Sequence, residues 1–298
     1  MSSKRIFGNI ALLVAALLWG STFVAQSVAS EAVQPFTFLA SRSLLGFLFL
    51  IPVSLIKDSA SKKAGTYQKM TADTKKLLLI GGACCGAALT IASGLQQFGM
   101  TGDNSGKAGF ITAMYILLVP ILGLFVKKKV RPIIWVCVAM GVVGLYLLCM
   151  TDGLKLATSD IFLMICAVAF SVHILVVDYF SPKVDGVKLS CLQFFVAFVI
   201  ATVLALIFED TSISTVLAAW FPIAYAGILS SGIAYTLQIV GQKHTEPTVA
   251  SLLMSLESVF AVLTSMIVLA QFPSGRELAG SVIMFAAIII SQLPERKK

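Results

Sequence analysis

The chain has 298 residues, of which 58% are hydrophobic and only 12% are charged, and its formal net charge is +8. Soluble globular domains contain about 25% charged residues. The composition of this chain therefore excludes a soluble globular protein and indicates an integral membrane protein. The six cysteines show no spacing typical of metal ligands, and we expect no metal and no cofactor.

Apolar runs of about 20 residues, the length that crosses a bilayer as a helix, recur along nearly the whole chain. Even the longest connector between them, Lys57–Lys76, is too short for a soluble domain. We predict ten transmembrane helices, which in chain order are Phe7–Val28, Phe36–Ile56, Leu77–Phe98, Lys107–Val126, Pro132–Cys149, Ile161–Asp178, Leu189–Phe208, Leu217–Gly241, Pro247–Ala270 and Gly275–Leu293.

Lysine and arginine lie mostly on one side of the predicted membrane. With the N-terminus in the cytoplasm, 18 of the 22 basic residues fall in cytoplasmic segments, three lie in outer connectors or helix ends, and Arg42 lies inside a span. This positive-inside bias orients membrane proteins. We therefore interpret the charge as a topology signal that places both termini in the cytoplasm at the cell membrane, and we expect no nucleic acid as a partner.

The second half of the chain is a weak copy of the first, with residues 1–152 as one five-helix repeat and residues 153–298 as the other. Five is an odd number, so the second copy enters the membrane from the opposite side, as in transporters that bind substrate near the midplane. The sequence thus predicts an all-α integral membrane protein of ten transmembrane helices in two inverted five-helix repeats. An offset of 151 places Asn9 on Asp160, Ser30 on Ser181 and Arg42 on Gln193, and an offset of 142 places Gln96 on Gln238 and Tyr115 on Glu257.

Polar residues in the first two spans are candidates for a binding site. Trp19, Thr22 and Gln26 lie at i, i+3 and i+7 and form one stripe, with Trp19 too deep for the interfacial belt, so they either line a cavity or pack between helices. Arg42 lies about 10 Å from the outer end of its span. It either extends to the outer headgroups or faces a cavity, where it would bind a carboxylate.

Two polar residues of the second copy have a counterpart in the first. His173 takes the place of Thr22, and it is either a proton acceptor or a neutral packing histidine that hydrogen-bonds a carbonyl. Gln238 matches Gln96, and the pair either bonds across the two copies or holds neighbouring helices together.

Glu257 is an acid in the middle of the apolar run Ser251–Ala270. A charge at the centre of a membrane helix costs about 3 kcal/mol, so an intramembrane carboxyl is a functional-site hypothesis by default. Its helical face also carries Ala250 and Met254, which turns the carboxyl away from lipid. Glu257 either binds substrate or a proton, or is a neutral acid that ties its helix to a neighbour.

Four stretches of the chain form a familiar set: ALLWGSTFVAQ at Ala16–Gln26, QPFTFLASRSLLGFLFL at Gln34–Leu50, GKAGFITAMYILLVP at Gly106–Pro120 and ASLLMSLESVFAVL at Ala250–Leu263. Together they resemble the EamA-type, ten-helix branch of the drug/metabolite transporter superfamily. The resemblance implies two inverted five-helix repeats, cytoplasmic termini and a central cavity that opens alternately to either side. Many relatives export amino acids or other small metabolites, and others carry nucleotide sugars, vitamins or drugs.

The sequence therefore predicts a gradient-driven transporter of a small metabolite, and an exporter of an amino acid or related amine fits best. No G-x-x-x-x-G-K-[ST] motif for ATP is present, and no nucleophile–base pair or metal cluster favours an enzyme. We also expect a coupling proton and membrane lipids as partners, and the expected oligomeric state is a monomer or a homodimer. Alternatives are an anionic nucleotide- or lipid-linked solute held by Arg42 and Lys107, and, more remotely, a structural or sensory role. The predicted midplane pocket consists of Glu257, Tyr115, Trp19, His173, Gln26, Arg42 and Gln238.

Overall fold

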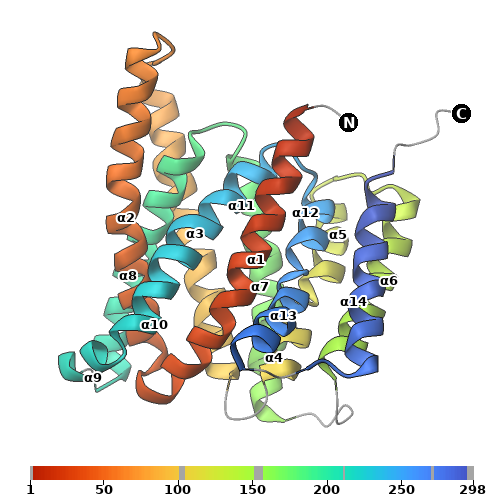
Figure 1. The fold of residues 1–298 in the computed structure, drawn as a ribbon. Helices are drawn as coiled ribbons and strands as arrows, with labels where there is room; N and C mark the ends of the chain where they lie inside the picture. Colours follow the sequence, from red (N-terminus) through yellow and green to blue (C-terminus); the bar gives the residue numbers. More distant parts are fainter. Residues whose placement is uncertain (1–2, 101–104, 151–156, 211, 270–271, 294–298) are drawn as a thin grey trace, which may run out of the picture.

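The computed structural model describes residues 3–100, 105–150, 157–210, 212–269 and 272–293, and all regular elements in these ranges are helices (Figure 1). The predicted boundary between the two repeats, at residues 152 and 153, lies outside the described residues. The first half contains α1 (Ser3–Ala32), α2 (Pro35–Lys63), α3 (Ala72–Gly99), α4 (Ser105–Thr112), α5 (Tyr115–Phe125) and α6 (Pro132–Cys149). The second half contains α7 (Thr158–Phe180), α8 (Gly186–Phe208), α9 (Ile213–Ala218), α10 (Trp220–Tyr225), the π-helix η1 (Ala226–Ala234), α11 (Tyr235–Gln242), α12 (Pro247–Met254), α13 (Glu257–Leu269) and α14 (Gly275–Ser291).

The predicted transmembrane spans are present. Within the described residues nine helical segments are long and apolar enough to cross a membrane. The tenth predicted span is α14, whose 17 residues lie beside α6 at the edge of the bundle (Figure 1). The fourth, eighth and ninth spans are each built from more than one helix, where the sequence predicted one continuous helix.

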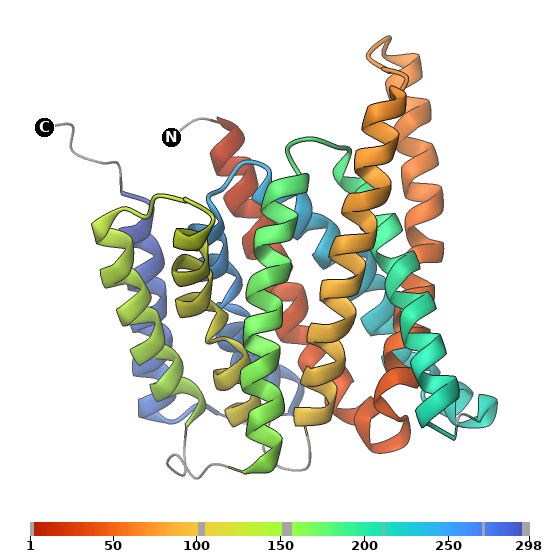
Figure 2. The same ribbon diagram turned by 180° about the vertical axis from the view of Figure 1, so that it is seen from behind.

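The two halves of the chain run in opposite directions through the bundle. In Figures 1 and 2, α1 begins at the end marked N and runs to the other end, whereas α7, the first helix of the second half, begins at that other end. α14 finishes at the end of the bundle where α1 begins. This confirms the prediction of an all-helical fold with an inverted duplication.

Helices of the two halves interleave. α2 packs against α8 and α6 against α14, so equivalent helices of the two copies are partners, while α3 packs against α7 and α1 against α11 and η1. Small residues permit the closest of these contacts. A Cβ atom at Gly280 on α14 would lie 2.6 Å from the carbonyl oxygen of Gly144 on α6, so backbone touches backbone there.

The outer faces of the helices are apolar. Ile10, Phe125 and Ile267 are 55%, 81% and 80% exposed, and many other large apolar side chains also face outward. Exposed apolar surface on this scale needs a nonaqueous partner, and in a multi-span protein that partner is the hydrocarbon of the bilayer.

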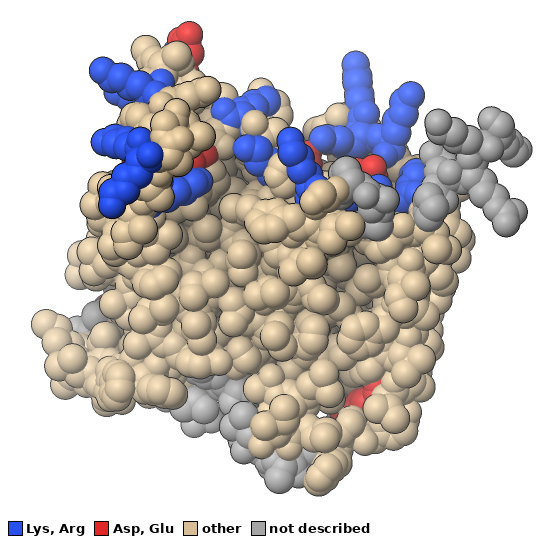
Figure 3. Space-filling view, turned by 45° about the horizontal axis from the view of Figure 1, so that its top comes forward, with Lys and Arg blue, Asp and Glu red and all other residues tan. Residues whose placement is uncertain are grey.

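Lysine and arginine side chains gather over the end of the bundle where α1 begins (Figure 3). At this end α2 continues to Lys63 and α3 begins at Ala72, so much of the connector predicted at Lys57–Lys76 is helical. The hairpin of α2 and α3 projects beyond the other helices (Figure 1). Its exposed lysines are Lys57, Lys62, Lys63, Lys69, Lys75 and Lys76.

Candidate functional site

Two spans are broken at equivalent places. The fourth span is interrupted at Ala113 and Met114, between α4 and α5, and the ninth at Ser255 and Leu256, between α12 and α13. The offset of 142 that relates Tyr115 to Glu257 also relates these breaks. Tight i to i−3 hydrogen bonds replace the α-helical ones at both places. Discontinuous helices near the midplane are where transporters place their binding sites.

Tyr115 and Glu257 are the first residues after the two breaks, and they meet. The Tyr115 hydroxyl donates a hydrogen bond of 3.0 Å to Glu257 Oε1. Glu257 lies in the first turn of α13, where the helix dipole favours a negative group. A carboxylate can therefore be held inside the membrane at this position.

A cavity lined by polar and aromatic side chains lies beside this pair, and the space in it that the centres of water-sized molecules can occupy is about 50 Å³. All seven residues predicted for the midplane pocket line it: Trp19, Gln26, Arg42, Tyr115, His173, Gln238 and Glu257. The structure thus brings together residues from α1, α2, α5, α7, α11 and α13. Its other lining residues are Thr22, Gln96, Thr112, Phe170, Ile174, Ser230, Tyr235 and Met254.

Arg42 is buried in this cavity wall and does not extend to the outer surface, since only 5% of it is exposed. Its Nε and Nη2 atoms donate hydrogen bonds of 3.2 Å each to the hydroxyls of Ser231 and Ser230. These serines are neighbours in η1, and the wider π-helical turn lets both reach one guanidinium. Within the described residues Arg42 forms no ion pair with a carboxylate.

Tyr235 is the centre of an aromatic wall that sequence reasoning missed. Its ring lies edge-on to Trp19 at 4.8 Å, to Phe194 at 5.6 Å and to the imidazole of His173 at 6.0 Å, as centroid distances. One signal for it existed in the sequence: Tyr235 precedes Gln238 by three residues, so both share a helical face.

The remaining predicted residues hold positions at the edges of the cavity. His173 is fully buried, and its Nε2 lies 2.9 Å from the side-chain oxygen Oε1 of Gln193, the repeat counterpart of Arg42. Gln26 donates a hydrogen bond of 2.8 Å to Gln97 and so joins α1 to α3. The side chain of Lys107 lies outside the described residues.

Several buried polar atoms on residues that line the cavity have no hydrogen-bond partner within the described residues. A buried polar atom left unpaired costs about 1–3 kcal/mol, so native structures rarely tolerate a group of them without a ligand or water. Both donors and acceptors are present, which suits a polar solute. These atoms are Trp19 Nε1, Thr112 Oγ1, His173 Nδ1 and Gln238 Oε1.

Comparison with known proteins agrees with this architecture. The model of the EamA-like transporter family matches residues 6–150 and residues 157–293, which is nearly the whole chain in two copies. The chain belongs to the EamA-like transporter family. This EamA-like transporter is therefore a multi-pass membrane protein that carries a small-molecule substrate, and it is not an enzyme.

Relatives with full-length similarity are also transporters. The EamA-like transporter is 28% identical over 293 residues to an uncharacterized transporter of Archaeoglobus fulgidus, covering 97% of this chain and 87% of that one. It is 20% identical over 306 residues to an uncharacterized transporter of Clostridium kluyveri, and the match covers 97% of this chain and 94% of that one. One solved crystal structure is similar with a TM-score of 0.76 at 18% identity over 96% of each chain, which shows a shared fold.

Tyr235→Ala should destabilise the EamA-like transporter by about 3–5 kcal/mol, the usual effect of removing a buried aromatic ring. Tyr235→Phe, which keeps the ring and loses the hydroxyl, should cost about 1 kcal/mol. Thermal unfolding of the purified variants in detergent measures the difference. Equal losses for the two variants would mean that the aromatic wall contributes little.

Proposed function

We propose that the protein is a gradient-driven exporter of an amino acid or related amine that works by alternating access. The two repeats, which we assign to residues 1–152 and 153–298, would move against each other around the cavity of Glu257 and Arg42. The observation that carries the proposal is the meeting of Tyr115 and Glu257 at two equivalent helix breaks beside this cavity. Outward transport is inferred from the resemblance to metabolite exporters.

Glu257 would bind the substrate ammonium group or a coupling proton. Its hydrogen-bond partner is a neutral phenol, and a carboxylate held in a membrane interior without a cation is costly. A bound ammonium or proton offsets that cost. The rings of Trp19 and Tyr235 line the same cavity and could add cation–π attraction.

Arg42 would bind the substrate carboxylate. Its guanidinium has five N–H donors, and two hydrogen bonds to serine hydroxyls leave donors available. A buried acid and a buried base in one cavity complement a zwitterion. The aromatic wall would hold the apolar part of the substrate.

An anionic nucleotide- or lipid-linked solute is the second candidate. The buried guanidinium of Arg42 without a carboxylate partner in the described residues is the observation that favours it. Glu257 disfavours it, because an acid in the same cavity repels an anion. Anion-dependent stabilisation of the purified protein, with no effect of amino acids, would favour this candidate.

We also propose that the termini lie in the cytoplasm at the cell membrane. The lysine-rich end of the bundle supports this orientation, because the positive-inside bias places basic connectors in the cytoplasm. The α2–α3 hairpin would then project into the cytoplasm.

Glu257→Gln should abolish substrate flux while the folded protein still reaches the membrane, because glutamine keeps the size of the side chain and loses the charge and the titratable proton. The measurement compares intracellular and extracellular metabolites in cells that overproduce the parent protein or the variant. Asp73→Asn, which removes an exposed acid outside the cavity, is the control and should leave flux unchanged. Undiminished flux through the Glu257 variant would defeat the assignment.

Arg42→Gln should discriminate between a zwitterion and an amine. Loss of a charge-assisted hydrogen bond, worth about 1.5–3 kcal/mol, should weaken binding of the amino acid by about 10- to 150-fold. Binding of the corresponding decarboxylated amine should change little. Competition of both compounds against flux in proteoliposomes measures this ratio, and an equal loss for the two compounds would exclude carboxylate binding by Arg42.

The orientation can be read from thiol labelling of intact cells. Ser212→Cys, at the end opposite the lysines, should react with a membrane-impermeant maleimide, whereas Lys63→Cys should react only after permeabilisation. The parent protein provides the background from native cysteines. The reverse pattern would place the termini outside.

A further inference from the structure

Helices α2 and α8 occupy equivalent positions in the two repeats and pack against each other in antiparallel orientation. Phe47 and Phe195 meet near the middle of this pair, with ring centroids 5.2 Å apart. Polar contacts join the two helices at both ends. One set of contacts lies at the lysine-rich end of the bundle, and the other set lies at the opposite end.

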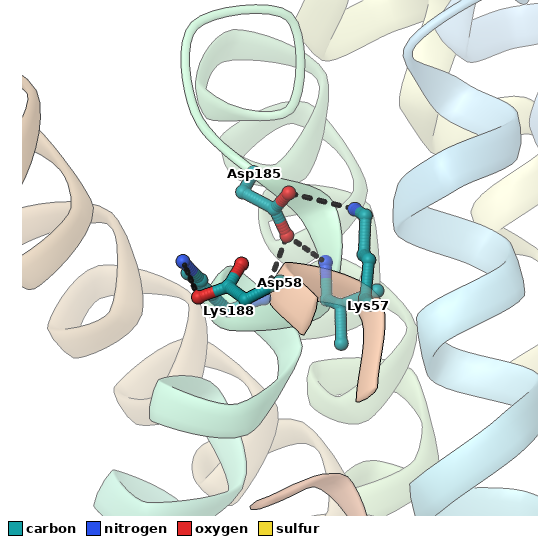
Figure 4. A network of polar contacts seen from close by, with 5 residues as sticks. Lys57, Asp58, Asp185 and Lys188 are labelled. Carbon is teal, nitrogen blue, oxygen red and sulfur yellow. Dashed lines mark hydrogen bonds and ion pairs between the residues drawn. The ribbon is translucent and has the colours of Figure 1, made fainter. Parts of the chain in front are cut away.

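At the basic end two ion pairs join the end of α2 to the start of α8 (Figure 4). Lys57 Nζ lies 2.6 Å from Asp185 Oδ2, and Lys188 Nζ lies 2.8 Å from Asp58 Oδ2. Asp185 also caps α8, since its Oδ1 accepts the N–H groups of Val187 and Lys188. We call these four charged residues the ionic clasp.

Asp185 keeps its charge in the ionic clasp. Burial acts to raise the pKa of this carboxyl, but the hydrogen bond from Lys57 and those from backbone N–H groups outweigh it and lower the pKa below its ordinary value. The contact is therefore an ion pair at neutral pH.

At the opposite end one carboxylate joins the end of α8 to the start of α2. Glu209 accepts the N–H groups of Phe36 and Thr37 at 2.7 and 2.8 Å and the hydroxyl of Thr37 at 2.7 Å. Gln34, the residue that precedes α2, makes no side-chain cap hydrogen bond, so the cap of α2 comes from the other repeat. We call this contact the capping clasp.

The two clasps are the same contact in two copies. The offset of 151 that relates Arg42 to Gln193 also places Asp58 on Glu209 and Thr37 on Lys188. In each copy a carboxylate at the end of one helix contacts the start of its partner. The chemistry differs, because one clasp consists of two partly exposed ion pairs and the other is a set of hydrogen bonds from a helix N-terminus to a carboxylate.

We propose that the ionic clasp and the capping clasp are alternating latches, one of which opens while the other stays closed. This inference rests on the proposed alternating access, because a cavity can open to one end only when helices of the two repeats separate there. The pair α2–α8 would then pivot about its apolar middle. Arg42 on α2 lines the cavity, so we expect separation of α2 from α8 at the basic end to open the cavity to the lysine-rich side, and separation at the Glu209 end to open it to the other side.

The difference in chemistry gives the two latches different sensitivities. The side chains of Lys57 and Asp185 are 45% and 29% exposed and carry opposite full charges, so salt screens their attraction. Glu209 in the capping clasp is half-buried and bonds only neutral donors, so salt weakens that contact less. High ionic strength should therefore open the basic end selectively. Exposed ion pairs are weak, which suits a contact that must break in every cycle.

The test measures both ends of the α2–α8 pair after weakening one of them. Spin labels at Lys62→Cys and Lys183→Cys report on the basic end, and labels at Gln34→Cys and Ser212→Cys report on the other, in a background without the six native cysteines and in lipid nanodiscs. The variants are Asp58→Asn with Asp185→Asn, and Glu209→Ala. Asp73→Asn and Asp210→Asn are matched controls, since both are exposed acids outside the clasps.

The double variant should increase the population with a long distance at the basic end by about two- to thirty-fold, as expected for the loss of two partly exposed ion pairs, and should decrease the long-distance population at the other end. Glu209→Ala should do the reverse. Salt at about 1 M reduces the Debye length to about 3 Å. It should therefore shift the distance populations of the parent protein in the same direction as the double variant does, and it should leave the populations of the double variant unchanged.

Hydrogen exchange on the chain with its native cysteines provides the second measurement. The double variant should raise exchange in residues 185–189 and lower it in residues 34–38, and the gain in protection at the distant end is the sign of coupling. Loosening at the mutated end alone, or at both ends together, would overturn the latches. If flux still depends on Glu257 in that case, the proposed transport function stands without them.

Discussion

A bilayer offers no water to unpaired backbone groups, and this constraint governs the whole structure. It requires helices where the chain faces lipid and permits irregular backbone only where protein or a polar cavity surrounds it. The two helix breaks, at Ala113–Met114 and Ser255–Leu256, and the π-helix η1 all lie next to the cavity. Ala113, Ser255 and Ser231 are 1% exposed or less, so these departures from α-helix are shielded from hydrocarbon.

The same constraint makes charge rare inside the bundle, and the two charged residues that line the cavity are not partners of each other. Glu257 contacts a phenol and Arg42 contacts two hydroxyls, so neither charge is neutralised by an ion pair within the described residues. Such an arrangement is expensive for a purely structural contact. It becomes favourable when a solute carries the complementary charges, which is the physical basis of the proposed amino-acid site.

Duplication supplies equivalent positions, and divergence gives them different chemistry. Tyr115 and Glu257 follow equivalent breaks, and one donates a hydrogen bond to the other. Asp58 lies in the last turns of α2 and Glu209 directly follows α8, and each contacts the start of the opposite helix. An inverted repeat with identical residues would treat both membrane sides alike. The differences between copies are therefore where direction and selectivity can arise.

Hydropathy and charge alone determined the spans, the inversion of the two halves and the presence of an intramembrane acid, because lipid imposes these features on any chain locally. All seven predicted pocket residues line one cavity, since polar side chains in a membrane must turn inward. Tertiary packing decided the rest. It buried Arg42 against two serines and made Tyr235 the centre of the aromatic wall. It also placed Glu209 at the N-terminus of helix α2, which is more than half the chain length away in the sequence. Such contacts depend on how helices rotate and cross, and helical periodicity fixes only which residues share a face.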